Sequence, residues 1–323
     1  MVYASICALL SLLLGLAIGG PIVAQLRARK LGKSYSGEEP EAYASKAGTP
    51  TMGGIIFLLP VVAIAVPIGF SRDSNVALPV LAMTAAAAMG AVDDFQTLAG
   101  REKLSGHEPW FWAVKWAALV GIGVAVACWL YFHLDFRDVL VPHFGAFALG
   151  LAYLPFTVAI FVVATSGAVI TDGMDGLMAG VSLIAYLAYA VIAFHQGQEG
   201  LAALALSVSG ASAAFLWFNA YPARVIMGEV GAYFLAVGLI VIAFMTGWWL
   251  LLPVIGVIYF AEGLSDVIQI AYFKATKGKR FFRMAPIHYH FQLGGWAETQ
   301  VVTRFWIAGL AGALAGIALS MTD

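Results

Sequence analysis

The sequence predicts an all-α, polytopic integral membrane protein with about ten transmembrane helices. Of its 323 residues, 62% are hydrophobic and only 11% are charged, and the mean hydropathy is +0.89. Soluble domains carry about 25% charged residues, so this composition excludes a water-soluble protein. The apolar runs are continuous and lack the alternation of a transmembrane β-barrel strand, which indicates helices. We expect residues 1–323 to form a single membrane domain.

Charge and cysteine content exclude several other classes. The 17 Lys and Arg against 18 Asp and Glu give a net charge of −1, so we expect no nucleic-acid partner. The two cysteines, Cys7 and Cys128, lie in apolar runs and form no metal-binding pattern, which excludes a disulfide scaffold or a structural zinc site. The N-terminus lacks the basic region and cleavage site of a signal peptide, so the first apolar run is expected to stay as a span.

A helix needs about 20 mostly apolar residues to cross the hydrocarbon core of a bilayer. Apolar runs separated by polar or Gly/Pro-containing breaks predict ten such spans, of which the eighth and ninth are separated by a very short break at Gly247. The predicted spans are 2–24, 51–70, 75–92, 110–132, 145–167, 175–195, 200–218, 230–246, 248–272 and 302–321.

The basic residues gather in alternate loops between these spans. The loops after the first, third, seventh and ninth spans hold 13 of them: Arg27, Arg29, Lys30, Lys33, Lys46, Arg101, Lys103, Arg224, Lys274, Lys277, Lys279, Arg280 and Arg283. The intervening loops hold only Arg72 and Arg137. Basic loops stay in the cytoplasm, so both termini are predicted to be periplasmic and the number of spans to be even.

Polar residues also gather on the predicted cytoplasmic loops, next to the ends of spans. The five clusters are Lys46–Gly54, Asp93–Asp94, Thr171–Gly176, Asn219–Glu229 and Arg283–His290. The predicted outer loops, in contrast, hold only scattered charges. Because five separate loops share this feature, the sequence predicts a functional site on the cytoplasmic face.

The acidic pairs in these clusters have two interpretations each. Asp93 and Asp94 abut a hydrophobic span, where a carboxylate is costly unless a cation compensates. This favours a metal or proton-transfer role over a solvated helix end. Asp172 and Asp175 are three residues apart and share one face of a helical turn. They suit either ligand binding or the capping of a helix N-terminus.

Hydroxyls and histidines complete the predicted site. The run Lys46–Gly54 contains Thr49 and Thr51 beside glycines, which suits a phosphate at a helix N-terminus or simply a turn. The side chains of His288 and His290 point to the same side in an extended chain but not in a helix. On the same side they suit a metal pair or an anion-binding pair. The other interpretation is that they are structural residues at the membrane interface. The predicted site therefore combines carboxylates with hydroxyls, histidines and nearby basic residues. Mg²⁺ binds carboxylate and phosphate oxygens together, so this set of residues favours Mg²⁺ and a phosphorylated substrate.

Five segments in chain order resemble one family along essentially the whole chain. They are KAGTPTMGG (46–54), GAVDD (90–94), TDGMDGL (171–177), FNAYPARVIMGEVG (218–231) and FRMAPIHYHFQLGGWAETQVVTRFWI (282–307). They resemble the bacterial phospho-N-acetylmuramoyl-pentapeptide transferases, within the polyprenyl-phosphate N-acetylhexosamine-1-phosphate transferase superfamily. The resemblance implies ten spans in the bacterial inner membrane, periplasmic termini and a cytoplasmic active site.

The resemblance also implies a reaction and roles for the residues. Undecaprenyl phosphate attacks the β-phosphate of UDP-MurNAc-pentapeptide, which gives lipid I and UMP with Mg²⁺ as cofactor. Asp93 matches the proposed base, Asp94 its acidic neighbour and Glu229 the magnesium ligand. His288 and His290 match the first and third of three consecutive histidines. The residues expected to contact substrate are Lys46, Thr51, Asp172, Asp175, Asn219 and His290, and a homodimer is suggested.

The sequence departs from the family pattern at several positions. The family lysine four residues after Asp93 is Thr97, an aromatic residue is replaced by Ile226, and Glu229 stands for an aspartate. The Asn-Leu-Thr-Asp run of the family appears as Val169-Ile170-Thr171-Asp172, without its asparagine. Tyr289 replaces the central histidine of the three.

These departures leave other functions open. One alternative is a divergent paralogue that transfers another sugar-1-phosphate, and a second is a non-catalytic homologue that binds lipid phosphate or a partner. A transporter is a third, although no internal repeat is apparent. Most spans lack charges, with Lys115, Glu262 and Asp266 as the clearest exceptions.

Overall fold

A computed structural model describes residues 1–29, 32, 46, 48–71, 74–98 and 109–322. Within these residues the strands are confined to one two-stranded hairpin, and eight helices are long and apolar enough to cross a membrane. A ninth candidate is a bent pair of helices. The predicted all-α, polytopic membrane protein is confirmed, while the number of crossings stays a prediction.

Nearly all of the predicted spans have a helical counterpart of similar extent. The long helices are α1 (Val2–Ala28), α2 (Ile55–Ser71), α3 (Ala77–Leu98), α5 (Pro109–Phe132), α6 (Tyr153–Val169), α7 (Leu177–His195), α8 (Glu199–Asn219), α9 (Gly228–Met245), α11 (Val257–Ala275) and α13 (Glu298–Ser320). The shorter ones are η2 (Ser74–Val76), η3 (Gly150–Ala152), η4 (Trp249–Leu251), α10 (Leu252–Ile255) and α12 (Ile287–Leu293). At 17 residues, α2 is shorter than the span predicted there.

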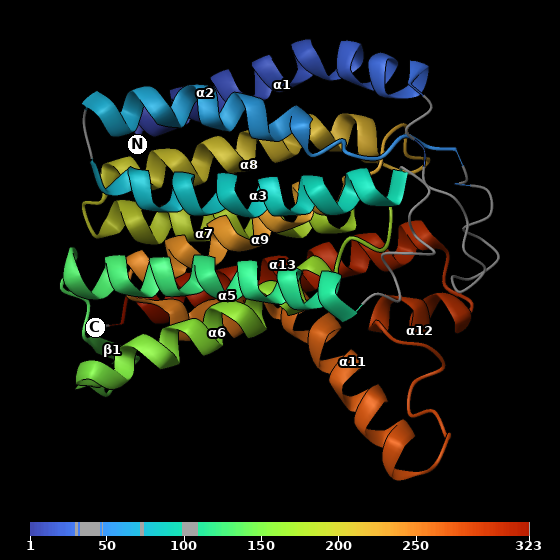
Figure 1. Cartoon of the computed structure of the whole chain (residues 1–323). Coiled ribbons are helices and arrows are strands. Elements are labelled where there is room, and N and C mark those ends of the chain that lie inside the picture. The colour runs from blue at the N-terminus through green and yellow to red at the C-terminus, as the bar shows by residue number, and fades with distance from the viewer. Residues whose placement is uncertain (30–31, 33–45, 47, 72–73, 99–108, 323) are drawn as a thin grey trace.

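The bundle is built around α7, α8 and α9 (Figure 1). Every residue of α9 from Val230 to Met245 is buried, because α3 and α6 pack against this helix. Helices α1 and α2 cover α8, and α13 covers α7. The outer helices keep exposed leucines and valines, such as Leu9 and Leu13 of α1, on the surface that a bilayer would cover.

Both ends of the chain lie at one end of the bundle, and α12 lies near the other (Figure 1). The loops that carry the predicted site gather at the α12 end, so site and termini are on opposite faces. This arrangement is what an even number of crossings produces. Which face meets the cytoplasm stays a prediction.

The prediction of one continuous ninth span over 248–272 is wrong. The chain breaks into η4, α10 and α11, and the two arms meet at an angle of 83°. The break lies at Gly256, whose φ of −96° and ψ of 33° are outside the helical range. Glycine is the weakest helix former after proline, so this position yields most readily. As a result α11 leans away from the bundle (Figure 1).

The predicted start of the fifth span at residue 145 is also wrong. Strands β1 (Asp138–Val141) and β2 (Gly145–Ala148) form an antiparallel hairpin, and α6 begins only at Tyr153. His143 and Gly145 take positive φ values of 65° and 82°, which turn the chain back at this point. The sequence of β2 is apolar, so it could not be told from the start of a span by hydropathy alone.

Helices α3 and α9 approach closely at Gly90. A Cβ atom at this position would clash with the backbone carbonyl of Glu229. Only glycine therefore permits this crossing, which places the next turn of α3, with Asp93 and Asp94, against the first turn of α9. The helix α3 continues to Leu98, so Asp93 and Asp94 are helical residues and do not open a loop as predicted.

Candidate active site

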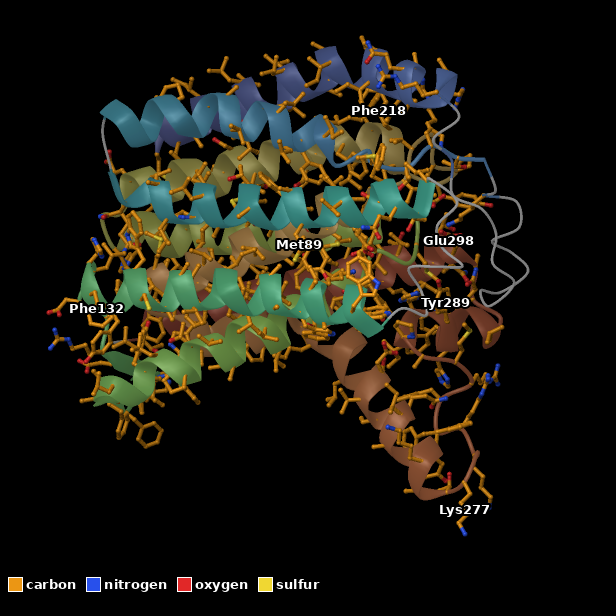
Figure 2. All side chains as sticks on the ribbon, viewed as in Figure 1. Met89, Phe132, Phe218, Lys277, Tyr289 and Glu298 are labelled. Carbon is orange, nitrogen blue, oxygen red and sulfur yellow. The ribbon has the colours of Figure 1, made fainter. Side chains whose placement is uncertain are left out.

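A polar cavity of about 460 Å³ opens at the α12 end of the bundle. It brings together residues from α3, the turn between α6 and α7, the start of α9, and α12. Its lining residues are Thr51, Asp93, Asp94, Thr97, Val169, Ile170, Asp172, Gly173, Ile226, Gly228, Glu229, Pro286, His288 and Tyr289. Six of the ten predicted site residues are in this list, while Lys46, Asp175, Asn219 and His290 are not. Figure 2 shows Tyr289 at this end of the molecule.

Asp94 is buried and caps the first turn of α9 from the neighbouring helix. Its Oδ1 accepts a hydrogen bond from the backbone N–H of Glu229, and its Oδ2 accepts one from Val230, both at 3.0 Å. A carboxylate at a helix N-terminus satisfies free N–H groups and complements the helix dipole. Asp94 thus fixes the backbone of Glu229, and the side chain of Glu229 does not cap its own helix.

Asp93 forms an ion pair with a residue that sequence reasoning did not place in the site. The Nζ of Lys115, on α5, lies 2.6 Å from Oδ2 of Asp93 and 3.6 Å from Oε2 of Glu229. The ammonium group also lies 5.5 Å from the ring centre of Trp112 and 5.3 Å from that of Tyr233. The sequence did contain an indication that Lys115 belongs to the site, because a lysine inside an apolar span is rare and commonly functional.

His288 is fully buried, and its Nδ1 lies 2.9 Å from Oε2 of Glu262 on α11, which is also fully buried. This contact fixes the orientation of the imidazole ring. The imidazole packs against Gly173, where a Cβ atom would clash with the ring. Nε2 is buried and has no hydrogen-bond partner among the described residues, and His288 lines the wall of the cavity.

The structure does not join His290 to His288, as an extended loop would have done. Both residues lie on the helix α12, where a spacing of two separates their side chains. Nδ1 of His290 accepts a hydrogen bond from the backbone N–H of Arg283 at 3.1 Å. Of the alternatives that the sequence left open, the metal pair and the anion-binding pair are therefore not formed by His288 and His290.

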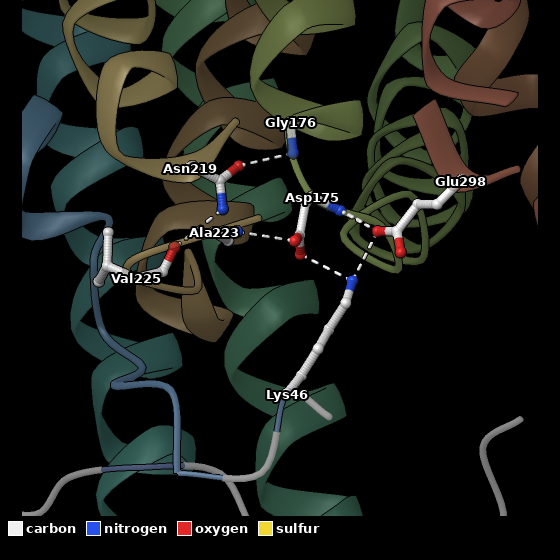
Figure 3. Close-up of polar contacts among 7 residues, drawn as sticks. All are labelled: Lys46, Asp175, Gly176, Asn219, Ala223, Val225 and Glu298. Atoms are coloured by element: carbon white, nitrogen blue, oxygen red, sulfur yellow. Dashed lines mark hydrogen bonds and ion pairs between the residues drawn. The ribbon is translucent and has the colours of Figure 1, made fainter. Parts of the chain in front are cut away.

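Lys46, Asp175 and Glu298 form a second polar cluster (Figure 3). The Nζ of Lys46 donates to Oδ1 of Asp175 at 2.7 Å and to Oε1 of Glu298 at 2.6 Å. Glu298 also accepts from the backbone N–H of Asp175 at 2.8 Å, and Asp175 accepts from that of Ala223 at 2.9 Å. Glu298 was not predicted, although the sequence shows an acidic residue just before the last predicted span, on the predicted cytoplasmic side.

Asn219 holds two loops together in place of lining the cavity. Its Oδ1 accepts from the backbone N–H of Gly176, and its Nδ2 donates to the carbonyl of Val225, both at 2.9 Å (Figure 3). The side chain is buried. It therefore joins the turn before α7, which carries Asp175, to the segment that leads into α9.

The predicted phosphate cradle at Lys46–Gly54 is not formed by the glycines. The N–H groups of Gly53 and Gly54 donate to the carbonyls of Ile226 and Met227, each at 2.9 Å. These groups are therefore not free to hold an anion. Thr51 is the residue of this segment that reaches the cavity wall.

The donor set of the cavity fits a magnesium ion that arrives with a phosphorylated substrate. The carboxylate of Glu229 is 38% exposed and lines the cavity together with Asp93 and Asp172. No group of three His, Cys, Asp or Glu in the described part of the chain is close enough to enclose a metal. Magnesium is commonly bound by one or two carboxylates plus substrate phosphates, so a complete protein cage is not needed.

Comparison with known proteins gives the family. Residues 76–247 match Glycosyl transferase family 4, and residues 46–58 match the phospho-N-acetylmuramoyl-pentapeptide-transferase signature 1. A phospho-N-acetylmuramoyl-pentapeptide-transferase of Chloroflexus aurantiacus is 38% identical over 99% of this chain and 90% of the relative. Those of Heliobacterium modesticaldum (37%, covering 95% of this chain and 94% of the relative) and Moorella thermoacetica (38%, 94% of each) are similar. The chain belongs to the phospho-N-acetylmuramoyl-pentapeptide-transferase family.

The departures from the transferase family pattern cluster on the cavity wall. All six residues named for them line it: Thr97, Val169, Ile170, Ile226, Glu229 and Tyr289. The departures expected from the resemblance therefore fall where a ligand in this cavity would be contacted.

Proposed function

We propose that this protein transfers phospho-MurNAc-pentapeptide from UDP-MurNAc-pentapeptide to undecaprenyl phosphate, which yields lipid I and UMP. The observation that supports it best is the cavity that joins Asp93, Glu229 and His288, set in a chain whose relatives carry the transferase name. In the reaction, an oxygen of the acceptor phosphate bonds to the β-phosphorus. The bond from this phosphorus to the bridging oxygen breaks, and UMP leaves with that oxygen.

Asp93 is proposed as the base that takes the proton from the acceptor phosphate. A base has to be ionised and exposed to its substrate. Asp93 lines the cavity, and the Nζ of Lys115 lies 2.6 Å from its Oδ2. Asp94, whose two oxygens bond the start of α9, is proposed to keep Glu229 in position.

Glu229 would hold the magnesium ion, and Asp93 and Asp172 are further carboxylates on the cavity wall. When bound, the ion neutralises the charge that develops on the phosphates. We propose that Nε2 of His288 accepts a hydrogen bond from a substrate group, because Glu262 fixes its ring orientation.

The nucleoside end of the donor is proposed to contact Thr51 and Asp172 on the cavity wall. Lys46 and Asp175 would border this region through the cluster that they form with Glu298. Asn219 is proposed to act on substrate only indirectly, because both ends of its amide bond the backbone. His290 has no proposed contact, because it does not line the cavity.

Transfer of another sugar-1-phosphate is a second candidate function. The observation that favours it is that Ile226 and Tyr289, which replace an aromatic residue and a histidine of the family pattern, both line the cavity. The transporter interpretation loses its support, because Lys115 and Glu262 are paired with site residues.

The test is an assay of UMP release by the purified protein with undecaprenyl phosphate. We expect release with UDP-MurNAc-pentapeptide and Mg²⁺, and none after addition of EDTA. Release with another UDP-N-acetylhexosamine in place of the pentapeptide donor would favour the second candidate. Absence of release with every donor would contradict both.

We further propose that the protein lies in the bacterial inner membrane with both termini in the periplasm, acts without nucleic acid, and pairs as a homodimer.

A fluorescent reporter that folds only in the cytoplasm is expected to be dark when fused after Asp323, because the basic loops lie on the opposite face. Fusion after Lys277, at the tip beyond α11, is the matched control and is expected to be bright (Figure 2). The reverse pattern would contradict the orientation.

A further inference from the structure

We propose that Lys115 binds the phosphate of the polyprenyl acceptor, an inference that rests on the proposed transferase function. The family lysine four residues after the first aspartate is absent, and Thr97 stands in its place. Thr97 lies one turn beyond Asp93 on α3, on the same face and on the cavity wall. Without a further cation, this part of the cavity would present carboxylates to an anionic substrate.

Lys115 supplies that cation from a different helix. Its Nζ lies between the carboxylates of Asp93 and Glu229, at 2.6 Å and 3.6 Å. The rings of Trp112 and Tyr233 flank the ammonium at 5.5 Å and 5.3 Å, which holds it on this side of α5. Its side chain is 14% exposed, so it is sheltered from bulk water yet accessible to a ligand.

A second observation indicates which substrate it contacts. An apolar groove of about 330 Å³ runs between α3 and α5 and is lined by Ala88, Met89, Val92, Asp93, Phe111, Val114, Lys115 and Ala118. Figure 2 shows Met89 on α3, away from Tyr289 at the site end, and its side chain is partly buried. Asp93 lines both this groove and the polar cavity.

The ion pair of Asp93 and Lys115 therefore stands where a polar cavity meets an apolar groove. A ligand that matches both surfaces has an anionic head and a long apolar tail, which describes a polyprenyl phosphate. The nucleotide donor has no comparable apolar part. We therefore place the acceptor phosphate against Lys115 and its first prenyl units between α3 and α5.

The experiment compares Lys115→Met, Lys115→Arg, Thr97→Lys and the double variant Lys115→Met/Thr97→Lys with the parent. Lys115→Met is expected to lower kcat/KM for undecaprenyl phosphate by about 10- to 100-fold, while KM for the UDP donor changes less than about threefold. Lys115→Arg should keep most of the activity. Thr97→Lys should restore at least part of the loss, because it returns a cation to the cavity wall. Lys274→Met, which removes an exposed cation at the end of α11, is the matched control.

A binding measurement separates this inference from the proposed function. We expect a short-chain polyprenyl phosphate to bind the parent and to raise its melting temperature, whereas the uncharged polyprenol should do so less. In Lys115→Met, the polyprenyl phosphate and the polyprenol should raise the melting temperature equally. This comparison tests the inference even if no donor supports turnover. Equal losses for both substrates, no rescue by Thr97→Lys, or unchanged binding of the polyprenyl phosphate by Lys115→Met would each overturn the inference.

Discussion

Replacing Asp93 with asparagine is expected to abolish transfer while the protein still folds. Loss of a general base lowers rates by about 10²- to 10⁴-fold. Asparagine keeps the shape and one acceptor oxygen near Lys115, and Glu229 remains 3.6 Å from the ammonium. We therefore expect a stability loss of only about 1–2 kcal/mol. UMP release at saturating concentrations of both substrates, together with a melting curve in the same detergent, measures both effects.

Asp94→Asn is the matched control one residue along the helix. An amide retains a single acceptor oxygen, so at most part of the cap on Glu229 and Val230 survives. This variant is expected to lose stability as well as activity, whereas Asp93→Asn loses mainly activity. Near-parental turnover in a well-folded Asp93→Asn protein would remove Asp93 from the mechanism.

Glu229→Gln is expected to raise the Mg²⁺ requirement sharply or to stop transfer. Magnesium demands near-octahedral geometry at about 2.0–2.1 Å, so it responds to both the charge and the length of a ligand. Glu229→Asp restores the usual family residue and should remain active. Mg²⁺ titrations of UMP release for the three proteins, with Mn²⁺ binding followed by paramagnetic resonance, measure the change.

The structure sharpens the interpretation of these variants. Asp94, and not the side chain of Glu229, bonds the first N–H groups of α9, so Gln at 229 should leave the helix start intact. The melting temperatures of the three proteins should therefore differ little. An unchanged Mg²⁺ titration in Glu229→Gln would show that Glu229 is not the ligand.

Hydropathy was sufficient to predict the helices, because continuous apolar runs of this length have few other solutions in a membrane. It failed where a local backbone property overrides composition. Gly256 breaks the predicted ninth span by its own φ and ψ. The apolar strand β2 was taken as the start of a helix because hydropathy does not encode the turn at His143.

The site was predictable in its loops but not in its pairings. Asp93, Glu229 and His288 stand in polar clusters near the ends of predicted spans, and the structure brings them to one cavity. Their roles stay predictions. Their partners Lys115 and Glu262 lie inside apolar helices 22 and 26 residues away, so only tertiary packing brings them to the site. Glu298 lies 252 residues from Lys46, a separation that no local pattern can bridge. His290 does not line this cavity, because the helix α12 separates its side chain from that of His288.

The close crossing of α3 and α9 at Gly90 has a consequence for how this enzyme family can diverge. The separation of Asp93 and Glu229 is set by two helices that touch, with no room for a methyl group between them. Changes in loop length or in the cavity wall leave that separation untouched. The wall at Ile226 and Tyr289 can therefore change without moving the backbone that places Asp93 against Glu229. We expect that the ligand selectivity of this protein can change while the separation of the proposed base from the proposed magnesium ligand stays the same.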